Sequence, residues 1–288
     1  MDDLSIPPLD LHDWALSEYE NMWNFNKFFS KPFFKLSDEY ISISDLTLDN
    51  ALFQNLFWMI RHCYTDDDSR CMAFYGRLFE KYAQILINSS SSKNENYSII
   101  PEFTCRSGKK SSDAYLQYQN NLIIIECKGF SILIDTLIKN KKIEKNNEKL
   151  FIKPVLQADE RFNEIVTIDK RFTDVTQTFI ISVTMDNINA VPKYYDEIYK
   201  KVEKNKKSPL TKYIYNFNIE EYELLMYLVE MNYNVIEILE DYFNRQIIEP
   251  FKSYLHKKFP NEIMRPKFLN TIYKELSRKI HTRLFGNK

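Results

Sequence analysis

Three ionisable side chains flank two short apolar stretches near the middle of the chain. Asp113 opens the first stretch, while Glu126 and Lys128 directly follow the four apolar residues 122–125. Side chains two residues apart on a strand point to the same face, so we expect Glu126 and Lys128 to emerge side by side. Two carboxylates and a lysine at the rim of an apolar sheet are costly to bury unless they serve a metal ion or one another.

The two stretches are typical of paired strands. β-branched residues bounded by turn formers favour a buried strand, and the polar residues 119–121 predict the turn of an antiparallel hairpin. Further strands are expected at 97–103, 178–185 and 213–217. A small hairpin is expected at 32–43, and helices at 11–25, 45–64, 72–88, 130–138, 154–165, 191–204 and through most of 218–288.

The order of these elements predicts an α/β fold, with a mixed central sheet flanked by helices and with helical N- and C-terminal extensions. We expect an acidic helical and hairpin region over 1–70, a core over 71–230 and a basic helical region over 231–288. Such charge asymmetry indicates an interaction surface at the basic end. A solvated helix face would explain it equally well.

Several classes of site are excluded by what the chain lacks. Four glycines, dispersed along 288 residues, cannot form a Gly-rich phosphate loop or a dinucleotide fingerprint. The four cysteines show no CxxC spacing and the four histidines no HxH or HExxH spacing, which argues against a zinc centre. The acidic triplet 66–68 is expected to be a solvated loop and helix cap rather than a metal cluster.

The spacing of Asp113, Glu126 and Lys128 resembles the PD-(D/E)xK nuclease superfamily, which has the restriction-endonuclease-like fold. Glu126-Cys127-Lys128 is the only Glu-x-Lys triplet of the sequence. The helix around Glu80 looks like the first core helix of that family, and helix 154–165 resembles the one that follows the ExK strand. The resemblance covers about residues 70–230. Two departures are Ser112 in place of the motif proline and Arg161 where a tyrosine is frequent.

The resemblance implies a site for Mg²⁺, or alternatively Mn²⁺, because a phosphodiesterase needs an activated water and a neutralised phosphate. Asp113, Glu126 and the backbone carbonyl of Cys127 would be the protein ligands. Glu80 would join them, or would be an exposed or salt-bridged helix residue. Lys128 would orient or deprotonate the attacking water and offset charge on the phosphate. Gln157 would be auxiliary.

The function implied is a metal-dependent endonuclease of the kind found in prokaryotic anti-phage or restriction-type defence, with DNA favoured over RNA as its substrate, although the sequence does not decide between the two. Two copies would serve to cut both strands, or a second protein of a defence system would act with it. The alternative is a catalytically silent nuclease-fold subunit that binds nucleic acid or a partner protein. Without a signal peptide or a long apolar run, we expect a cytoplasmic protein that does not bind membranes.

Overall fold

The computed structural model describes most of the chain, and its helices and strands form two compact units. One unit comprises 1–74 with 132–143, and the other comprises 75–131 with 144–288. The residues described are 1–19, 27–28, 31–49, 60, 63–65, 68–92, 94–129, 148–185, 192–245, 249–262 and 265–286.

The first unit contains a three-stranded mixed sheet in the order β1-β2-β3. The hairpin predicted at 32–43 is present, with an antiparallel pair of strands and Ser37 at φ 56° in its turn. The short polar segment between the strands thus takes the left-handed backbone that a tight turn needs. The elements are β1 (Ser5–Ile6), α1 (Pro8–Ser17), β2 (Phe33–Leu36), β3 (Glu39–Ser42) and α3 (Asp45–Asp49).

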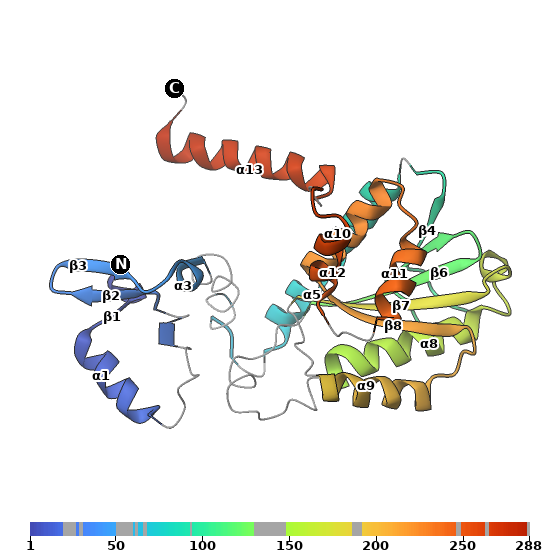
Figure 1. Ribbon diagram of the computed structural model, residues 1–288, viewed down its shortest axis with the longest axis horizontal. Helices are drawn as coiled ribbons and strands as arrows, with labels where there is room; N and C mark the ends of the chain where they lie inside the picture. Colours follow the sequence, from blue (N-terminus) through green and yellow to red (C-terminus); the bar gives the residue numbers. More distant parts are fainter. Residues whose placement is uncertain are drawn as a thin grey trace. The chain divides into compact units, whose positions relative to one another are not determined.

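The second unit carries a five-stranded sheet in the order β4-β5-β6-β7-β8 (Figure 1). β4, β5 and β6 pair antiparallel, whereas β7 and β8 are added in parallel. Its elements are α5 (Arg70–Ser91, which begins in the first unit), β4 (Tyr97–Pro101), β5 (Ala114–Tyr118), β6 (Asn121–Lys128), α8 (Lys153–Ile165), β7 (Gln177–Thr184), α9 (Pro192–Asn205), β8 (Thr211–Asn218), α10 (Ile219–Glu230), α11 (Val235–Phe243), α12 (Phe251–Lys258) and α13 (Lys267–Phe285); short helical turns span Glu148–Ile152 and Lys170–Phe172. The structure therefore confirms an α/β fold with a mixed sheet flanked by helices.

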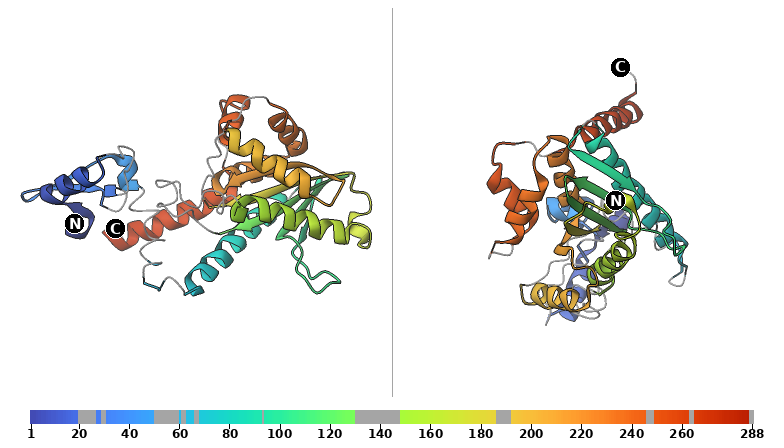
Figure 2. Two further views of the ribbon diagram at one scale, coloured as in Figure 1. Left: turned by 90° about the horizontal axis from the view of Figure 1, so that it is seen from below. Right: turned by 90° about the vertical axis from the view of Figure 1, so that its right-hand side faces the viewer.

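The alternation of side chains along the strands divides the core of this unit into two layers. Ile123 and Ile125 of β6 pack with α5, α10, α11 and α12, whereas Leu122 and Ile124 pack with α8 and α9. The two further views show the helices on opposite faces of the sheet (Figure 2). The central strands β6 and β7 are buried on both faces, which explains their nearly continuous apolar sequences.

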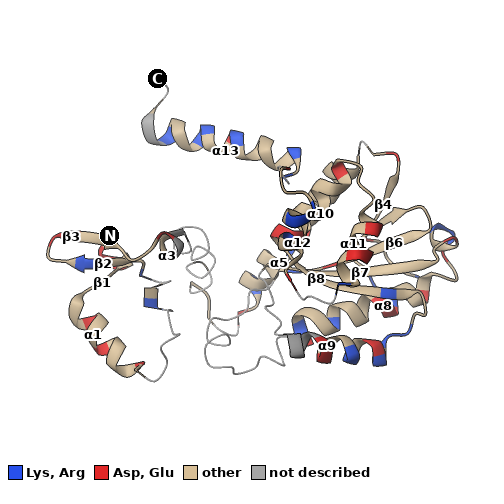
Figure 3. Cartoon of the chain, in the orientation of Figure 1, with Lys and Arg blue, Asp and Glu red and all other residues tan. Residues whose placement is uncertain are grey.

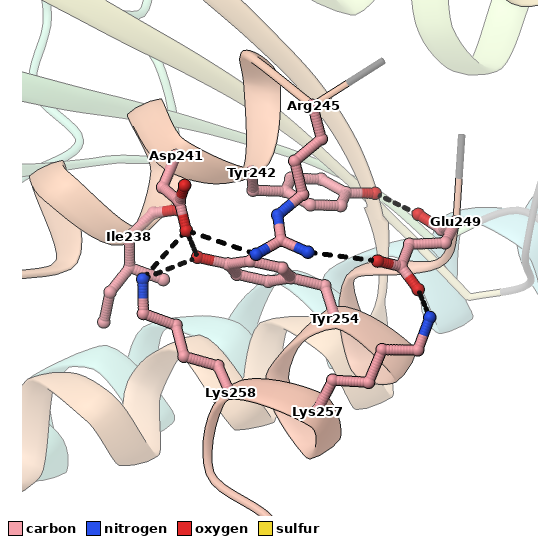
Figure 4. Close-up of polar contacts among 8 residues, drawn as sticks. All are labelled: Ile238, Asp241, Tyr242, Arg245, Glu249, Tyr254, Lys257 and Lys258. Atoms are coloured by element: carbon pink, nitrogen blue, oxygen red, sulfur yellow. Dashed lines mark hydrogen bonds and ion pairs between the residues drawn. The ribbon is translucent and has the colours of Figure 1, made fainter. Parts of the chain in front are cut away.

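The first helices of the predicted basic region belong to this same core. Phe251, Tyr254 and Leu255 of α12 are completely buried. Asp241 of α11 accepts hydrogen bonds from the Tyr254 hydroxyl at 2.6 Å and from Lys258 at 2.9 Å, which joins the two helices (Figure 4). The region 231–288 is thus not separate from the core, because α11 and α12 supply part of the apolar layer on the sheet.

Three of the predicted helices are not fully covered by the described residues. The helix expected at 130–138 lies outside them, as do residues 20–25 of the helix expected at 11–25 and most of the helix expected at 45–64, of which α3 is the start. Within the described part of the chain, no helix combines the length and the apolar character needed to cross a bilayer.

Candidate metal centre

The β5–β6 hairpin brings the two predicted carboxylates together. Ala114 pairs with Ile125 at the end of the antiparallel ladder. Asp113 directly precedes β5, and continuing the same register by one residue sets it against Glu126. The turn consists of Gln119, which adopts φ 53°, and Asn120; β6 begins one residue earlier than the sequence predicts, at Asn121. Because the two strands of the hairpin have matching lengths on either side of the turn, two residues that are thirteen positions apart in the sequence come to lie opposite each other.

Glu126 and Lys128 lie on the same face of β6, as the period of a strand requires. Lys128 Nζ lies 3.4 Å from Glu126 Oε2; the lysine side chain is 33% exposed and the glutamate side chain 3%. Cys127, between them, points to the other face and is buried in the apolar layer beneath α5 and α10. The lysine therefore reaches solvent while the carboxylate beside it does not.

The backbone of Cys127 forms the link to Asp113. Its N–H donates to Asp113 Oδ2 at 2.7 Å. The N–H and C=O of one strand residue point to the same side, and β5 begins only at Ala114. The Cys127 carbonyl is thus directed to the edge where Asp113 lies, beyond the end of the hairpin ladder.

The electrostatics of the site are those of carboxylates crowded in a poorly hydrated place. Burial, and then the charge of Asp113, raise the pKa of Glu126 to about 7, although Lys128 acts in the opposite direction. Burial also raises the pKa of Asp113, while the Cys127 N–H and the Lys128 ammonium lower it. Two carboxylates in such surroundings cannot both ionise cheaply without a cation between or beside them.

Glu80, on α5, lies within electrostatic range of Asp113 and Lys128. Burial and the charge of Asp113 raise the pKa of Glu80, whereas Lys128 lowers it. Close packing explains the approach: an added Cβ on Gly129, just after β6, would lie 2.8 Å from the Cα of Gly76, one helical turn before Glu80. The lack of a side chain at Gly129 thus allows the helix to lie directly on the end of the strand.

The loop before β5 contributes two residues that the sequence did not single out. Lys110 forms an ion pair with Glu102 at 2.8 Å, and both charges act on the pKa of Asp113. The loop is folded on itself, with the Cys105 N–H donating to the Lys109 carbonyl at 2.8 Å and with Gly108 at φ 77°. In the sequence, the adjacent residues Lys109 and Lys110, a few residues before Asp113, were the signal that could have indicated Lys110.

Gln157 is present on α8 but is exposed. Within the described residues, no hydrogen bond connects it to Asp113, Glu126 or Lys128. Arg161, one turn further along the helix, is mostly buried and forms an ion pair with Glu164 at 3.7 Å. The structure therefore brings together Asp113, Glu126 and Lys128. Glu80 is near enough for the charges of Asp113 and Lys128 to act on its pKa, and no hydrogen bond among the described residues supports the predicted auxiliary role of Gln157.

The donor set at this edge of the sheet suits a hard divalent cation with few protein ligands. Asp113, Glu126 and the Cys127 carbonyl offer oxygen, the donor that Mg²⁺ prefers, and Mg²⁺ usually retains several waters. Among the described residues, no three side chains of the His, Cys, Asp and Glu types are grouped closely enough to hold a metal ion. The fit thus rests on two carboxylates and a carbonyl, with Glu80 as a neighbour rather than an established third ligand.

Comparison with known proteins adds no further assignment, because the chain matches no family model, no curated protein and no solved structure.

Proposed function

We propose that the protein is a divalent-metal-dependent nuclease that hydrolyses phosphodiester bonds, with DNA as its substrate. The observation that carries this proposal is the convergence of Asp113, Glu126 and Lys128 at one end of the β5–β6 hairpin. The two opposed carboxylates can hold a cation, and the solvent-facing ammonium beside them can contact an anionic phosphate.

Each residue has a chemical task in this proposal. Asp113, Glu126 and the Cys127 carbonyl would hold the cation, and Mg²⁺ when bound would polarise the phosphate and lower the pKa of the attacking water. Lys128 reaches solvent next to Glu126, so its charge can orient a water and offset the negative charge that develops on the phosphate. The Cys127 N–H fixes one oxygen of Asp113 and thereby sets the orientation of that carboxylate.

The succession of elements around the site also supports the proposal. The PD-(D/E)xK resemblance implies a helix, an antiparallel hairpin ending in ExK, a second helix and a further strand. This order is met by α5, β5, β6, α8 and β7. Agreement of fold alone is an analogy, which is why the proposal depends on the site.

Cleavage of plasmid DNA by the purified full chain tests the proposal. With Mg²⁺ or Mn²⁺ present we expect cutting, and Glu126→Ala and Lys128→Ala should each reduce the rate by about 100-fold or more. Glu95→Ala and Lys212→Ala, at exposed positions of the same unit, are the matched controls and should cut like the wild type.

The absence of metal-dependent cutting of any DNA or RNA by the wild type would contradict the proposal. Metal binding without cutting would instead favour the alternative of a silent nuclease-fold subunit that binds nucleic acid or a partner protein. A place in prokaryotic anti-phage or restriction-type defence, with a second copy or a partner subunit, stays a prediction from the resemblance.

A further inference from the structure

The segment 102–111, which leads into Asp113, is folded into a hairpin. Two backbone hydrogen bonds close its tip: the Cys105 N–H donates to the Lys109 carbonyl at 2.8 Å, and the Gly108 N–H donates to the Cys105 carbonyl at 2.9 Å. Gly108 turns the chain with φ 77°, in the left-handed region that glycine adopts without strain. The 102–111 hairpin is therefore held in shape by its own backbone.

The underside of the hairpin is anchored in the core of the second unit. Cys105 is 6% exposed, and Phe103 packs against the same apolar cluster. The centroid of the Phe103 ring lies 6.0 Å from that of Tyr115 and 4.1 Å from the guanidinium carbon of Arg171. The hairpin thus has a fixed orientation on this unit.

The other side of the hairpin faces solvent and is cationic. Arg106, Lys109 and Lys110 are exposed, and the residues 103–112 include no Asp or Glu. The Arg106 guanidinium forms no ion pair or hydrogen bond with a described residue. Lys109 lies 4.0 Å from Glu164 of α8, which is longer than a charge-assisted hydrogen bond. Both cations are therefore open to an anion from solvent.

The carboxylates next to the hairpin do not neutralise it. Glu164 faces two cations, Lys109 at 4.0 Å and the mostly buried Arg161 at 3.7 Å. Arg161 Nε and Nη1 have no hydrogen-bond partner among the described residues. Lys110 is paired with Glu102 at 2.8 Å but is 74% exposed, and such a surface pair is weak. A positive potential therefore remains over the hairpin.

The hairpin runs directly into the metal centre. Lys109 and Lys110 precede Asp113 by four and three residues, and an extended chain spans at most about 3.5 Å per residue. Their backbones therefore lie within about 14 Å of Asp113. The phosphates of one DNA strand follow one another at about 3.4 Å along the axis. The two lysines are thus within about four nucleotides of a phosphate held at the metal centre.

We infer that the 102–111 hairpin binds the phosphate backbone of the DNA strand that enters the metal centre, with Arg106 and Lys109 as the contacting residues. This inference rests on the proposed function, which makes DNA the substrate. Because the hairpin is already ordered, its cations meet the strand without the entropic cost of folding a loop. Contacts to phosphates position the strand and carry no preference for a base.

The test measures the anisotropy of a fluorescent DNA duplex titrated with the full chain in EDTA, where binding is separated from metal-dependent cutting. We expect the double variant Arg106→Ala/Lys109→Ala to lower the slope of log affinity against log salt concentration by about two. Its affinity at about 0.1 M salt should fall by about 10- to 100-fold.

Two further double variants serve as controls. Arg106→Lys/Lys109→Arg retains both charges and should bind within about threefold of the wild type. Lys204→Ala/Lys212→Ala removes two charges from exposed positions on α9 and β8 of the same unit and should bind like the wild type. The thermal midpoint of every variant should equal that of the wild type, since no short hydrogen bond of a side chain is removed at Arg106 or Lys109.

Three results would overturn the inference. In the first, Arg106→Ala/Lys109→Ala binds DNA with the affinity and salt slope of the wild type. In the second, Lys204→Ala/Lys212→Ala loses as much affinity, so that total charge and not the hairpin governs binding. In the third, Arg106→Lys/Lys109→Arg loses as much as the alanine variant, so that charge is not what the hairpin supplies.

These outcomes are distinct from a failure of the proposed function. A wild type that binds DNA through the hairpin but never cuts it would contradict the proposed function and support the inference. A wild type that cuts DNA but binds it as tightly without Arg106 and Lys109 would contradict the inference alone. A wild type that binds no DNA would contradict both.

Discussion

At the scale of single residues, the raised pKa of the buried Glu126 makes the stability of the metal-free protein depend on pH. A carboxyl whose pKa is raised by burial holds its proton in the native state at a pH where the unfolded chain has released it. Between the ordinary pKa of 4.5 and the native value of about 7, the native state binds more protons than the unfolded state. Stability must therefore fall as the pH rises through this window.

We predict that Glu126→Gln removes this loss. In EDTA, the wild type should lose up to about 3 kcal/mol of unfolding free energy between pH 4.5 and 7.5, at about 1.4 kcal/mol per pKa unit, relative to the variant. Urea unfolding at a series of pH values measures the difference. Glu95→Gln, at an exposed position, should follow the wild type, and a parallel dependence in Glu126→Gln would contradict the assignment.

At the scale of elements, the contact between α5 and the end of β6 decides whether Glu80 can approach the site. We predict that Gly129→Ala destabilises the protein by about 1–3 kcal/mol, because the new Cβ would lie 2.8 Å from the Gly76 Cα and 2.9 Å from the Phe79 Cβ. Metal binding should weaken as the helix shifts. Thermal and urea unfolding together with Mn²⁺ calorimetry measure both effects.

Gly76→Ala is the control for this prediction. A Cβ at Gly76 meets nothing within 4 Å, and alanine is favoured over glycine within a helix by about 1 kcal/mol. The variant should therefore be as stable as the wild type or more stable. Equal effects of the two substitutions would show that the close approach at Gly129 is not what joins helix and strand.

The hydrogen-bonded cluster between α11 and α12 supports a second prediction at this scale. Tyr254→Phe removes the hydroxyl that donates to Asp241 and accepts from Lys258. We expect a loss of about 1–2 kcal/mol, since the bond to Asp241 is charge-assisted. The pKa of Asp241 is lowered first by Tyr254 and then by Lys258, so the part of the stability due to Asp241 is present above its ordinary pKa and fades as the pH falls below it.

Urea unfolding at pH 7 and pH 3 measures this dependence. Because Asp241 is nearly half exposed, solvent screens its interactions and the change with pH should be small. Tyr273→Phe on α13, where the side chain is exposed, should leave the stability unchanged. A Tyr254→Phe variant as stable as the wild type at pH 7 would contradict the role of the cluster.

The hairpin that carries the site could be predicted from sequence because its signal is local. Apolar alternation and a polar turn lie within sixteen residues, and the thirteen-residue spacing of Asp113 and Glu126 implies their opposition in a register centred on that turn. The parallel addition of β7 and β8 follows long connections, for which no local pattern specifies the partner. The packing of Gly129 on Gly76, one helical turn before Glu80, is a tertiary fact that no spacing reveals.

At the scale of the whole molecule, the basic end of the chain consists of two different parts. α12 is a component of the core, as the complete burial of Phe251 shows. α13 has an ordered start, where the Lys267 N–H donates to Glu230 at 2.8 Å, but its residues 270–283 are all exposed. Lys and Arg residues are distributed along this helix (Figure 3), which makes α13 the better candidate for contact with phosphates.

We predict that deleting 270–288 weakens DNA binding without unfolding the protein. Each lost contact between a Lys or Arg side chain and a DNA phosphate should reduce the slope of log affinity against log salt concentration by about one. Fluorescence anisotropy at several salt concentrations measures the slope, and the thermal midpoint serves as the control. Deletion from 251 onward should instead unfold the chain. Unchanged affinity after removal of 270–288 would place the DNA contact elsewhere.

The most direct test of the metal centre couples cleavage to metal binding. DNA cutting by the wild type is measured as Mg²⁺ is titrated and is compared with Glu126→Gln and the exposed control Glu95→Gln. Cutting should saturate with Mg²⁺ in the wild type and in the control, and it should be lost in Glu126→Gln. Equal cutting by Glu126→Gln and the wild type, or cutting that continues in EDTA, would contradict a metal centre at Glu126.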